Sequence, residues 1–136
     1  MTESKMKIMH FVHSLNEGGI ERLLLDLCKK IDKNKFEIQV CCLVEKGSMA
    51  HEYENAGIKL HYVNARRDLK FKNFIPNFFV IFRIVKLLKK EKICITHGHE
   101  FFSTVFSRIA GLLAGVNKRY VTFHNVYTWW GKGVHK

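Results

Sequence analysis

The stretch KIMHFVHSLNEGGIERLLLDL, residues 7–27, decides how this chain folds. Its first part, residues 7–13, is an apolar run that predicts a buried strand. The following segment, 20–31, predicts a helix, because its apolar residues recur at the spacing of one helical face. These residues are Ile20, Leu23, Leu24, Leu27, Cys28 and Ile31. A pair of adjacent glycines, Gly18 and Gly19, separates the predicted strand from the predicted helix.

The same alternation of strand and helix continues along the chain. Further strands are predicted at 35–44, 58–63, 92–96 and 119–123, and further helices at 48–56, 73–90 and 102–113. The turn HGHE, residues 97–100, is expected to end the fourth strand. Apolar strands that alternate with helices are typical of a parallel sheet covered on both faces. Because crossovers are right-handed, we expect an α/β fold with a doubly wound, Rossmann-like parallel sheet in the order 3-2-1-4-5.

Composition narrows the classes of partner. The chain has 136 residues, enough for one domain, and its formal net charge is +11. Such a charge favours an anionic partner, which could be nucleic acid, a phosphorylated small molecule or an acidic membrane face. No helix-turn-helix, zinc finger or RNA-recognition motif is present, so nucleic acid is not expected as a partner. Neither a signal peptide nor an apolar run of membrane-spanning length is apparent.

The cysteines point to a reducing compartment. Cys28, Cys41, Cys42 and Cys94 have no C-x-x-C spacing. We expect all four to be small buried hydrophobic residues, with Cys94 pointing into the core. This usage fits a cytoplasmic protein.

Polar residues gather after three of the predicted strands. The groups that follow strands one, four and five include four of the eight histidines. They are His13, Ser14 and the Gly18–Gly19 pair, then His97, Gly98, His99 and Glu100, then His124 and Asn125. The carboxyl ends of strands one and four flank the switch point of the expected sheet, where open α/β sheets bind ligands. We therefore expect a site there.

Each element of this predicted site has a structural and a functional interpretation. Gly18 and Gly19 could cap the helix at 20–31, or they could allow backbone amides to touch a phosphate at the positive helix end. Their spacing does not match the dinucleotide or phosphate-loop motifs. His97 and His99 could bind a polar ligand as neutral imidazoles, or they could cap a turn while Glu100 offsets the dipole of the next helix.

The histidines lead to two further expectations, one about metal binding and one about His124. No metal is expected, because no third ligand stands at suitable spacing from His97 and His99. His124, directly after a strand, is well placed for contacts to protons or hydroxyl groups.

The helix at 74–90 has basic residues beside several aromatic ones. A basic face next to exposed aromatic side chains is typical of a helix at a membrane interface. The alternative is a core helix with a charged, solvated side. On the first interpretation, the residues that face the membrane are Arg83, Lys86, Lys89 and Lys90.

Taken together, these motifs resemble the amino-terminal domain of a family-4-type glycosyltransferase, a retaining enzyme with two facing Rossmann-like domains in the GT-B arrangement. The resemblance rests on residues 7–27, on AGIKLHYV at 56–63, on ICITHGHEFFS at 93–103 and on VTFHNVY at 121–127. Its most specific parts are Gly18, Gly19 and Glu21 in the GGxE stretch, and TFHN at 122–125. One small departure is Ile20, where the family often has alanine.

This resemblance implies roles for several residues. The backbone at Gly18 and Gly19 would approach the diphosphate of a nucleotide-sugar donor, and His124 would lie beside the transferred sugar as the catalytic residue. His97, His99, Glu100 and Asn125 would contact the substrate on the acceptor side. The acceptor would be a polysaccharide or glycolipid, lipid-linked or free, and no metal or other cofactor would be needed.

The resemblance also implies that residues 1–136 form an incomplete domain without the donor-binding domain. Half a cleft cannot stabilise a leaving diphosphate, so we expect the chain alone to be inactive. Its partners would be a donor-binding domain or subunit and an anionic membrane surface. The protein would be cytoplasmic and would act at the inner face of that membrane. The alternative is a stand-alone Rossmann-like module that binds a nucleotide or phosphorylated metabolite, with Glu45 holding a ribose.

Overall fold

One parallel sheet forms the centre of the molecule. The computed structural model describes residues 3–67 and 70–124. Within them, five parallel strands pair in the order β3-β2-β1-β4-β5. The strands are β1 (Met6–Val12), β2 (Phe36–Cys42), β3 (Lys59–Tyr62), β4 (Ile95–His99) and β5 (Lys118–Thr122). The predicted doubly wound, Rossmann-like fold and its strand order are confirmed.

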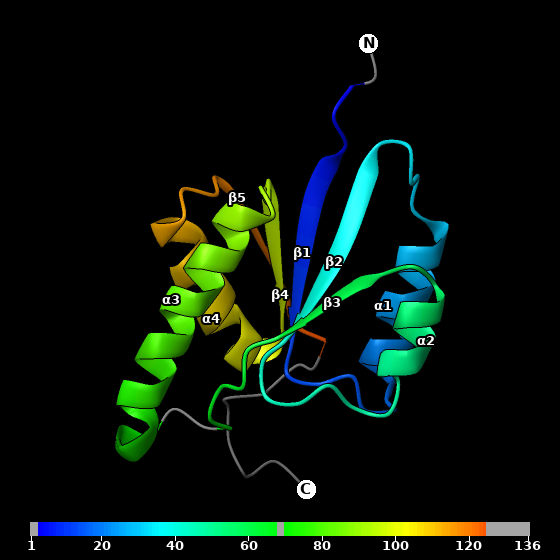
Figure 1. Ribbon diagram of the computed structural model, residues 1–136. Coiled ribbons are helices and arrows are strands. Elements are labelled where there is room, and N and C mark those ends of the chain that lie inside the picture. Colours follow the sequence, from blue (N-terminus) through cyan, green and yellow to red (C-terminus); the bar gives the residue numbers. More distant parts are fainter. Residues whose placement is uncertain (1–2, 68–69, 125–136) are drawn as a thin grey trace, which may run out of the picture.

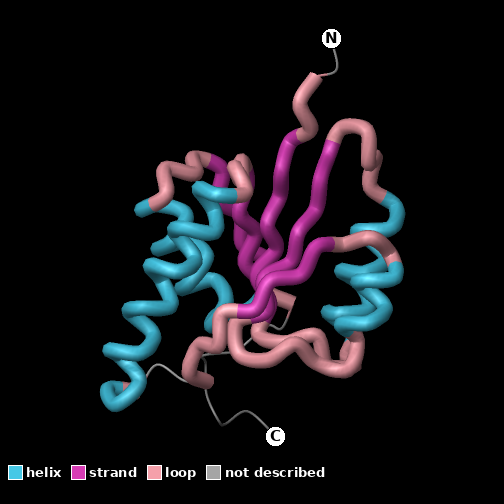
Figure 2. The backbone as a smooth tube through the Cα atoms, in the orientation of Figure 1, coloured by secondary structure: helices cyan, strands magenta, loops and turns pink. Residues whose placement is uncertain are grey.

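Helices cover both faces of this sheet. They are α1 (Gly19–Lys30), α2 (Ala50–Asn55), α3 (Phe74–Lys90) and α4 (Glu100–Leu113), and a 3-10 turn, η1 (Phe71–Asn73), leads into α3. Figure 1 shows α1 and α2 on one side of the strands and α3 and α4 on the other. The strands come together at their carboxyl ends, at the lower centre of Figure 2.

The alternation of side chains along β1 tells which residues face which helices. Met9 and Phe11 belong to the core formed with α3 and α4. Val12 belongs to the core formed with α1 and α2. Because successive side chains of a strand point to opposite faces, His10 shares the face of Val12. This face is called the α1 face below.

The fourth strand begins at Ile95, later than predicted. The predicted start at residue 92 is wrong because the chain first has to end α3. Lys92 adopts a left-handed backbone (φ 56°), and the Ile93 amide donates to the Leu88 carbonyl at 3.0 Å. His97 and His99 therefore lie inside β4, and the predicted HGHE turn does not form.

Gly98 allows the close approach of α4 to β4. A Cβ atom at this position would lie 2.5 Å from the Ser107 Oγ and 2.9 Å from the Thr104 Cα. The glycine thus serves helix-to-strand packing and not a turn.

The same close approach determines which face of α4 is buried. Small residues, including Ser103, Ser107 and Ala110, are buried against the sheet, while Ile109 and Leu113 are exposed. In α1 the predicted stripe is partly wrong. Leu24 and Cys28 are buried as predicted, but Leu25 takes the place expected for the exposed Leu23 and Leu27.

Three of the four cysteines follow the prediction. Cys28, Cys41 and Cys42 are buried, and burial raises the pKa of each thiol, in Cys28 to about 12. Such thiols stay protonated and unreactive at neutral pH. The prediction for Cys94 is wrong: this residue precedes β4 and is exposed.

Candidate functional site

The diglycine turn lies at the carboxyl edge of the sheet, between β1 and α1. Gly18 is the N-cap of α1, as one of the two interpretations expected, and its backbone is extended (φ −172°). A Cβ atom at Gly19 would meet no atom of the described residues within 4 Å, and the Gly19 backbone is not left-handed. The folded chain therefore gives no steric reason for glycine at position 19. The open space beside it is available to a group from outside.

The turn is held by the neighbouring loop that follows β2. The Glu17 amide donates to the Ser48 Oγ at 3.2 Å, and the Ser48 amide donates to the Asn16 Oδ1 at 3.3 Å. The Asn16 side-chain amide also donates to Glu45 at 3.0 Å. These bonds hold the loop between β1 and α1 in place, and this loop sets the direction in which the first backbone amides of α1 point.

Four histidines form a continuous cluster on the α1 face, from β1 to the end of β5. His10 pairs with His97 in the β1–β4 register, and His99 pairs with Thr122 in the β4–β5 register. The Nδ1 of His10 lies 3.0 Å from the Nε2 of His99, and the Nδ1 of His99 lies 3.0 Å from the Nε2 of His124. His97, His99 and His124 were predicted site residues, and the structure brings them together.

His10 was not predicted as a site residue. The sequence pattern pointed to the ends of strands, whereas His10 lies in the middle of β1. A histidine inside an apolar strand run is itself a signal, because a buried imidazole needs a hydrogen-bond partner.

Burial keeps the inner histidines neutral. His10 is 3% exposed and His99 is 5% exposed. Desolvation, followed by the nearby imidazoles, lowers the pKa of His10 and lowers the pKa of His99 to about 3. Burial also lowers the pKa of His97, with His124 as the second cause. The polar groups that the inner two rings bond are other histidines, and ligand binding by His97 and His99 stays a prediction.

His97 is the most open of the three histidines within strands. Its ring is half-buried, and its Nε2 bonds the Thr122 hydroxyl at 2.7 Å. It stacks on His99 with ring centroids 4.4 Å apart and meets the exposed ring of Tyr120 edge-on at 6.4 Å. His97 can therefore present a polar group to a ligand on the α1 face.

A third histidine does lie close to His97 and His99, although their spacing in the sequence gave no sign of it. One ring nitrogen each of His10, His97 and His99 lies within 4.8 Å of the others. A tetrahedral zinc ion with bonds of about 2.0–2.1 Å would hold its ligands about 3.4 Å apart. The group would have to contract and exchange the His10–His99 hydrogen bond for a metal bond. The absence of a metal requirement stays a prediction.

The remaining predicted site residues lie around this cluster. Glu100 occupies the first turn of α4, where its charge opposes the helix dipole, as one interpretation expected. Burial, followed by the charge of Arg67, lowers the pKa of His13, while Glu100 acts in the opposite direction. His13 itself packs edge-on against Phe102. Asn125 lies outside the described residues.

The outer surface of α3 is apolar in its first half and basic in its second. Phe74, Phe78, Phe79 and Phe82 are exposed by 47–66%, so the expectation of surface aromatic residues is confirmed. Lys86, Lys89 and Lys90, called the α3 lysines below, are exposed as well.

Arg83 differs from the α3 lysines because its guanidinium donates to the Val63 carbonyl at 3.1 Å. A groove of about 290 Å³ between α3 and α4 adjoins Phe74 and Phe78. Within the described part of the chain, no helix combines the length and apolarity needed to cross a bilayer.

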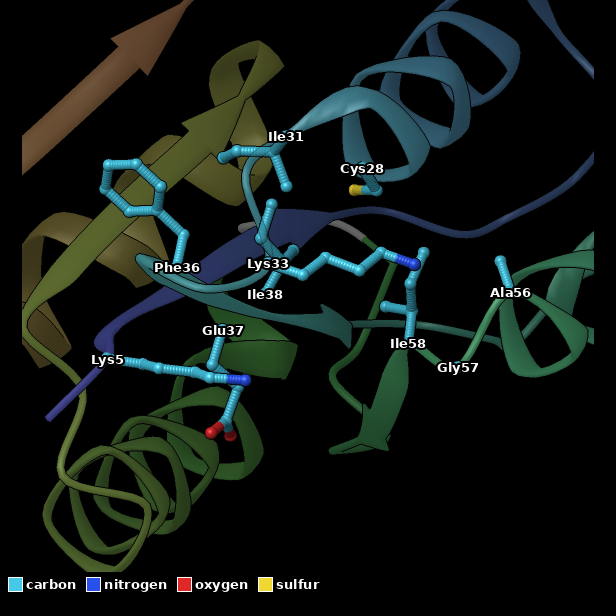
Figure 3. A pocket seen from close by; sticks show the side chains of 10 residues that line it. All are labelled: Lys5, Cys28, Ile31, Lys33, Phe36, Glu37, Ile38, Ala56, Gly57 and Ile58. Atoms are coloured by element: carbon cyan, nitrogen blue, oxygen red, sulfur yellow. The ribbon is translucent and has the colours of Figure 1, made fainter. Parts of the chain in front are cut away.

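A second cavity lies away from the histidines. It measures about 200 Å³ and is lined by residues around the starts of β1, β2 and β3 and the end of α1 (Figure 3). Its charged residues are Lys5 before β1, Lys33 in the loop after α1 and Glu37 in β2. The cavity therefore lies at the amino edge of the sheet. Ligands of open α/β sheets bind at the carboxyl edge, so we assign the site to the histidine cluster and the diglycine turn.

The model of the family described as Glycosyltransferase Family 4 matches residues 17–136. The chain belongs to glycosyltransferase family 4. The predicted resemblance to the amino-terminal domain of such an enzyme is thereby confirmed.

Three curated proteins show the same relationship. The capsular polysaccharide biosynthesis glycosyltransferase CapH of Staphylococcus aureus is 31% identical over 119 residues, which cover 87% of this chain and 30% of the relative. A UDP-Gal:alpha-D-GlcNAc-diphosphoundecaprenol alpha-1,3-galactosyltransferase of Escherichia coli is 30% identical, covering 85% of this chain and 29% of the relative. The putative glycosyltransferase EpsF of Bacillus subtilis is 28% identical, covering 98% and 33%. The chain spans about a third of the length of these relatives.

Solved structures agree on the fold. A UDP-N-acetylglucosamine 2-epimerase superposes with a TM-score of 0.53 at 17% identity, covering 88% of this chain and 33% of the epimerase. The C-terminal domain of a hydrogenase from Pyrococcus furiosus superposes with a TM-score of 0.52 at 12% identity, covering 88% and 91%. At these identities the likeness concerns the fold alone.

Proposed function

We propose that this chain is the acceptor-binding, amino-terminal part of a retaining glycosyltransferase of the GT-B arrangement. The enzyme would transfer a sugar from a nucleotide-sugar to a polysaccharide or glycolipid acceptor. One observation carries the proposal: the diglycine turn follows the carboxyl end of β1, and the His97–His99–His124 group lies on the neighbouring strand β4 and at the carboxyl end of β5. Membership of family 4 supports the sugar-transfer chemistry.

The donor diphosphate is assigned to the diglycine turn. The first amides of a helix have no partner within the helix, and the helix dipole makes this end positive. At α1 these amides follow Gly18, and within the described ranges no atom lies within 4 Å of the place that a Cβ at position 19 would occupy. A diphosphate could therefore come within hydrogen-bond distance of the backbone.

The transferred sugar and the acceptor are assigned to the α1 face of β4 and β5. His124 is the catalytic residue of the proposal, and its Nδ1 is the ring nitrogen that does not bond His99. His97, half-buried beside Tyr120, faces the acceptor side, to which we also assign Glu100 and Asn125. His99 belongs to the substrate site through His124, because both of its ring nitrogens bond other histidines.

The proposal includes a donor-binding domain, in the same polypeptide or a separate one. A leaving diphosphate develops charge that positive groups must neutralise. The only chain elements we assign to it are backbone amides, so residues 1–136 alone are proposed to be inactive. We propose no metal and no other cofactor.

We propose that this protein binds its acceptor at the inner face of a membrane. The name of the Escherichia coli relative specifies a diphosphoundecaprenol-linked acceptor, which is a lipid. In this chain, the exposed phenylalanines of α3 could enter the interfacial region while the α3 lysines and Arg83 attract anionic headgroups. We therefore propose a cytoplasmic protein that is bound peripherally to the membrane.

The test is a transfer assay on two proteins. One is this chain by itself, and the other is the same chain joined to the remainder of CapH, which would supply the donor-binding domain. With a panel of nucleotide-sugars and a lipid-linked acceptor, only the joined protein is expected to transfer sugar, with the anomeric configuration retained. Turnover by the chain alone, or an inverted product from the joined protein, would contradict the proposal.

A stand-alone nucleotide-binding module is the second candidate. Glu45 follows β2 at the carboxyl edge, and a carboxylate in that position suits ribose hydroxyls. However, this carboxylate already accepts a bond from Asn16 and pairs with Arg67 at 3.5 Å. Calorimetry on the chain with nucleotides separates the candidates, because micromolar binding favours the module and no saturation at millimolar nucleotide favours the half-enzyme.

A further inference from the structure

His10 and His99 have no direct part in the proposed transfer. They are nevertheless joined by hydrogen bonds to His124, the proposed catalytic residue. His10 and His99 are almost fully buried, and neither can reach a ligand that stays on the surface. In the series His10, His99, His124, the Nδ1 of one ring lies 3.0 Å from the Nε2 of the next. The contacts are thus head-to-tail, with the same pair of atoms at each junction.

We propose that His10, His99 and His124 form a hydrogen-bonded series of imidazole rings that share one tautomer. His10 and His99 are then positioning residues for His124. The proposal rests on the proposed function for the role of His124. The bonding pattern itself is independent of that function.

The coupling follows from the proton count of imidazole. A neutral ring has one N–H and one acceptor nitrogen, so it can donate at one end only. If His10 donates from Nδ1 to His99, then His99 carries its proton on Nδ1 and must donate to His124. If His124 donates from Nε2 to His99, then His99 carries its proton on Nε2 and must donate to His10. The three rings are either all Nδ1–H or all Nε2–H.

Burial holds the middle ring to this rule. The pKa of His99 is lowered to about 3 by desolvation and by the neighbouring His97 and His124, so this ring carries one proton at neutral pH. Its orientation is also fixed, because His97 stacks on it at 4.4 Å with an interplanar angle of 24°. A rotated His99 ring would break both bonds of the series.

The shared tautomer also decides the state of Nδ1 of His124, the ring nitrogen that does not bond His99. In the first arrangement the Nδ1 of His124 carries the proton and is a donor, and in the second the neutral ring offers Nδ1 as an acceptor. What His124 presents to a sugar or phosphate oxygen therefore depends on a buried residue two rings away. Metal-binding histidines are oriented in the same way by the group that bonds their other ring nitrogen.

The test reads the tautomers directly. Side-chain ¹⁵N shifts of His10, His99 and His124 are measured by NMR on the 15N-labelled chain at about pH 8, without donor or acceptor. The expected result is the same ratio of Nδ1–H to Nε2–H in all three rings. Different ratios in neighbouring rings would overturn the proposal, and this measurement needs no variant.

Variants then test whether His10 acts on His124. His10→Leu has a similar volume but no polar atom, and it is expected to change the tautomer ratio of His124 about fivefold. Such a change corresponds to about 1 kcal/mol at about 1.4 kcal/mol per tenfold, the usual net value of a hydrogen bond. His10→Asn, whose amide can replace Nδ1, is expected to restore the wild-type ratio within about twofold.

His51→Gln, at an exposed position of α2, is the matched control and is expected to leave the ratio unchanged. An unchanged His124 ratio in His10→Leu, in a variant whose circular dichroism shows a native fold, would overturn the positioning role. Failure of sugar transfer in the joined protein, with the shared tautomer present, would instead count against the proposed function alone.

Discussion

Mild acid should destabilise this protein, because its buried histidines must stay neutral in the folded chain. The perturbation is a change from about pH 8 to about pH 5. In the unfolded chain a histidine has a pKa near its ordinary value of 6.5, whereas burial lowers the pKa of His99 in the folded chain to about 3. Between these two values the unfolded chain binds more protons than the folded chain. Stability therefore falls as the pH falls through this window.

The size of the effect follows from these two pKa values. For His99 alone, proton binding to the unfolded chain lowers the free energy of unfolding by about 2 kcal/mol at about pH 5. Burial also lowers the pKa of His10, His13, His61 and His97, so their contributions have the same sign. The loss in the wild-type chain is therefore expected to be larger than about 2 kcal/mol, a substantial part of the stability of a small domain.

Urea unfolding followed by far-UV circular dichroism measures this loss. The free energy of unfolding is determined at both pH values for the wild type, for His99→Gln and for the exposed control His51→Gln. Each variant is compared with itself at about pH 8, so a general loss of stability in His99→Gln does not affect the comparison. The pH-dependent loss is expected to be smaller by about 2 kcal/mol in His99→Gln and unchanged in His51→Gln.

Two results would refute the reasoning. A wild-type loss below about 0.5 kcal/mol, well under the linkage contribution of a single buried histidine, would mean that the fold does not hold the histidines neutral. Equal losses in the wild type and in His99→Gln would mean that the acid sensitivity has its origin elsewhere.

The other predictions concern two glycines and the α3 lysines. Gly98→Ala should lower the free energy of unfolding by about 1–3 kcal/mol in urea, because its Cβ would collide with the Thr104 backbone, and an unchanged value would contradict the close packing of α4 on β4. Gly19→Ala should leave stability unchanged or raise it by up to about 1 kcal/mol, since no atom of the described segments lies near the new methyl group, yet it should reduce transfer by the joined protein at least about tenfold. Changing all three α3 lysines to glutamine should abolish sedimentation with anionic vesicles, whereas Lys29→Gln with Lys30→Gln on α1 should not; equal binding by both would remove the membrane proposal.

The strand order could be predicted from the sequence because it depends on patterns that are local and strong. Apolar runs such as residues 7–13 alternate with helical stripes, and the handedness of crossovers leaves few sheet orders. The N-cap at Gly18 followed from the same local logic.

The start of β4 could not be predicted in this way. Residues 92–96 have the composition of a strand, but Lys92 and Ile93 are used to end α3. Helix ends and strand starts compete for the same residues, and tertiary packing decides between them. Tertiary packing also decides which face of α4 is buried. Small residues of α4 face the sheet because Gly98 allows the helix to come close to β4.

The candidate site was predicted in part. The gathering of His97, His99 and His124 follows from the adjacency of β4 and β5, which the strand order predicts. The part played by His10 depends on register, which pairs it with His97 across β1 and β4. Register between strands that are far apart along the chain leaves no local trace in the sequence.

The central claim is that His124 lies beside the transferred sugar, and one rate measurement tests it most directly. The initial rate of sugar transfer is measured for the joined protein with His124→Ala and, as the control, with His51→Ala. We predict that His124→Ala lowers kcat at least about a hundredfold, the lower range expected for a group that acts on the reacting atoms, while His51→Ala stays within about twofold of the wild type. A His124→Ala protein that transfers sugar at the wild-type rate would contradict the central claim.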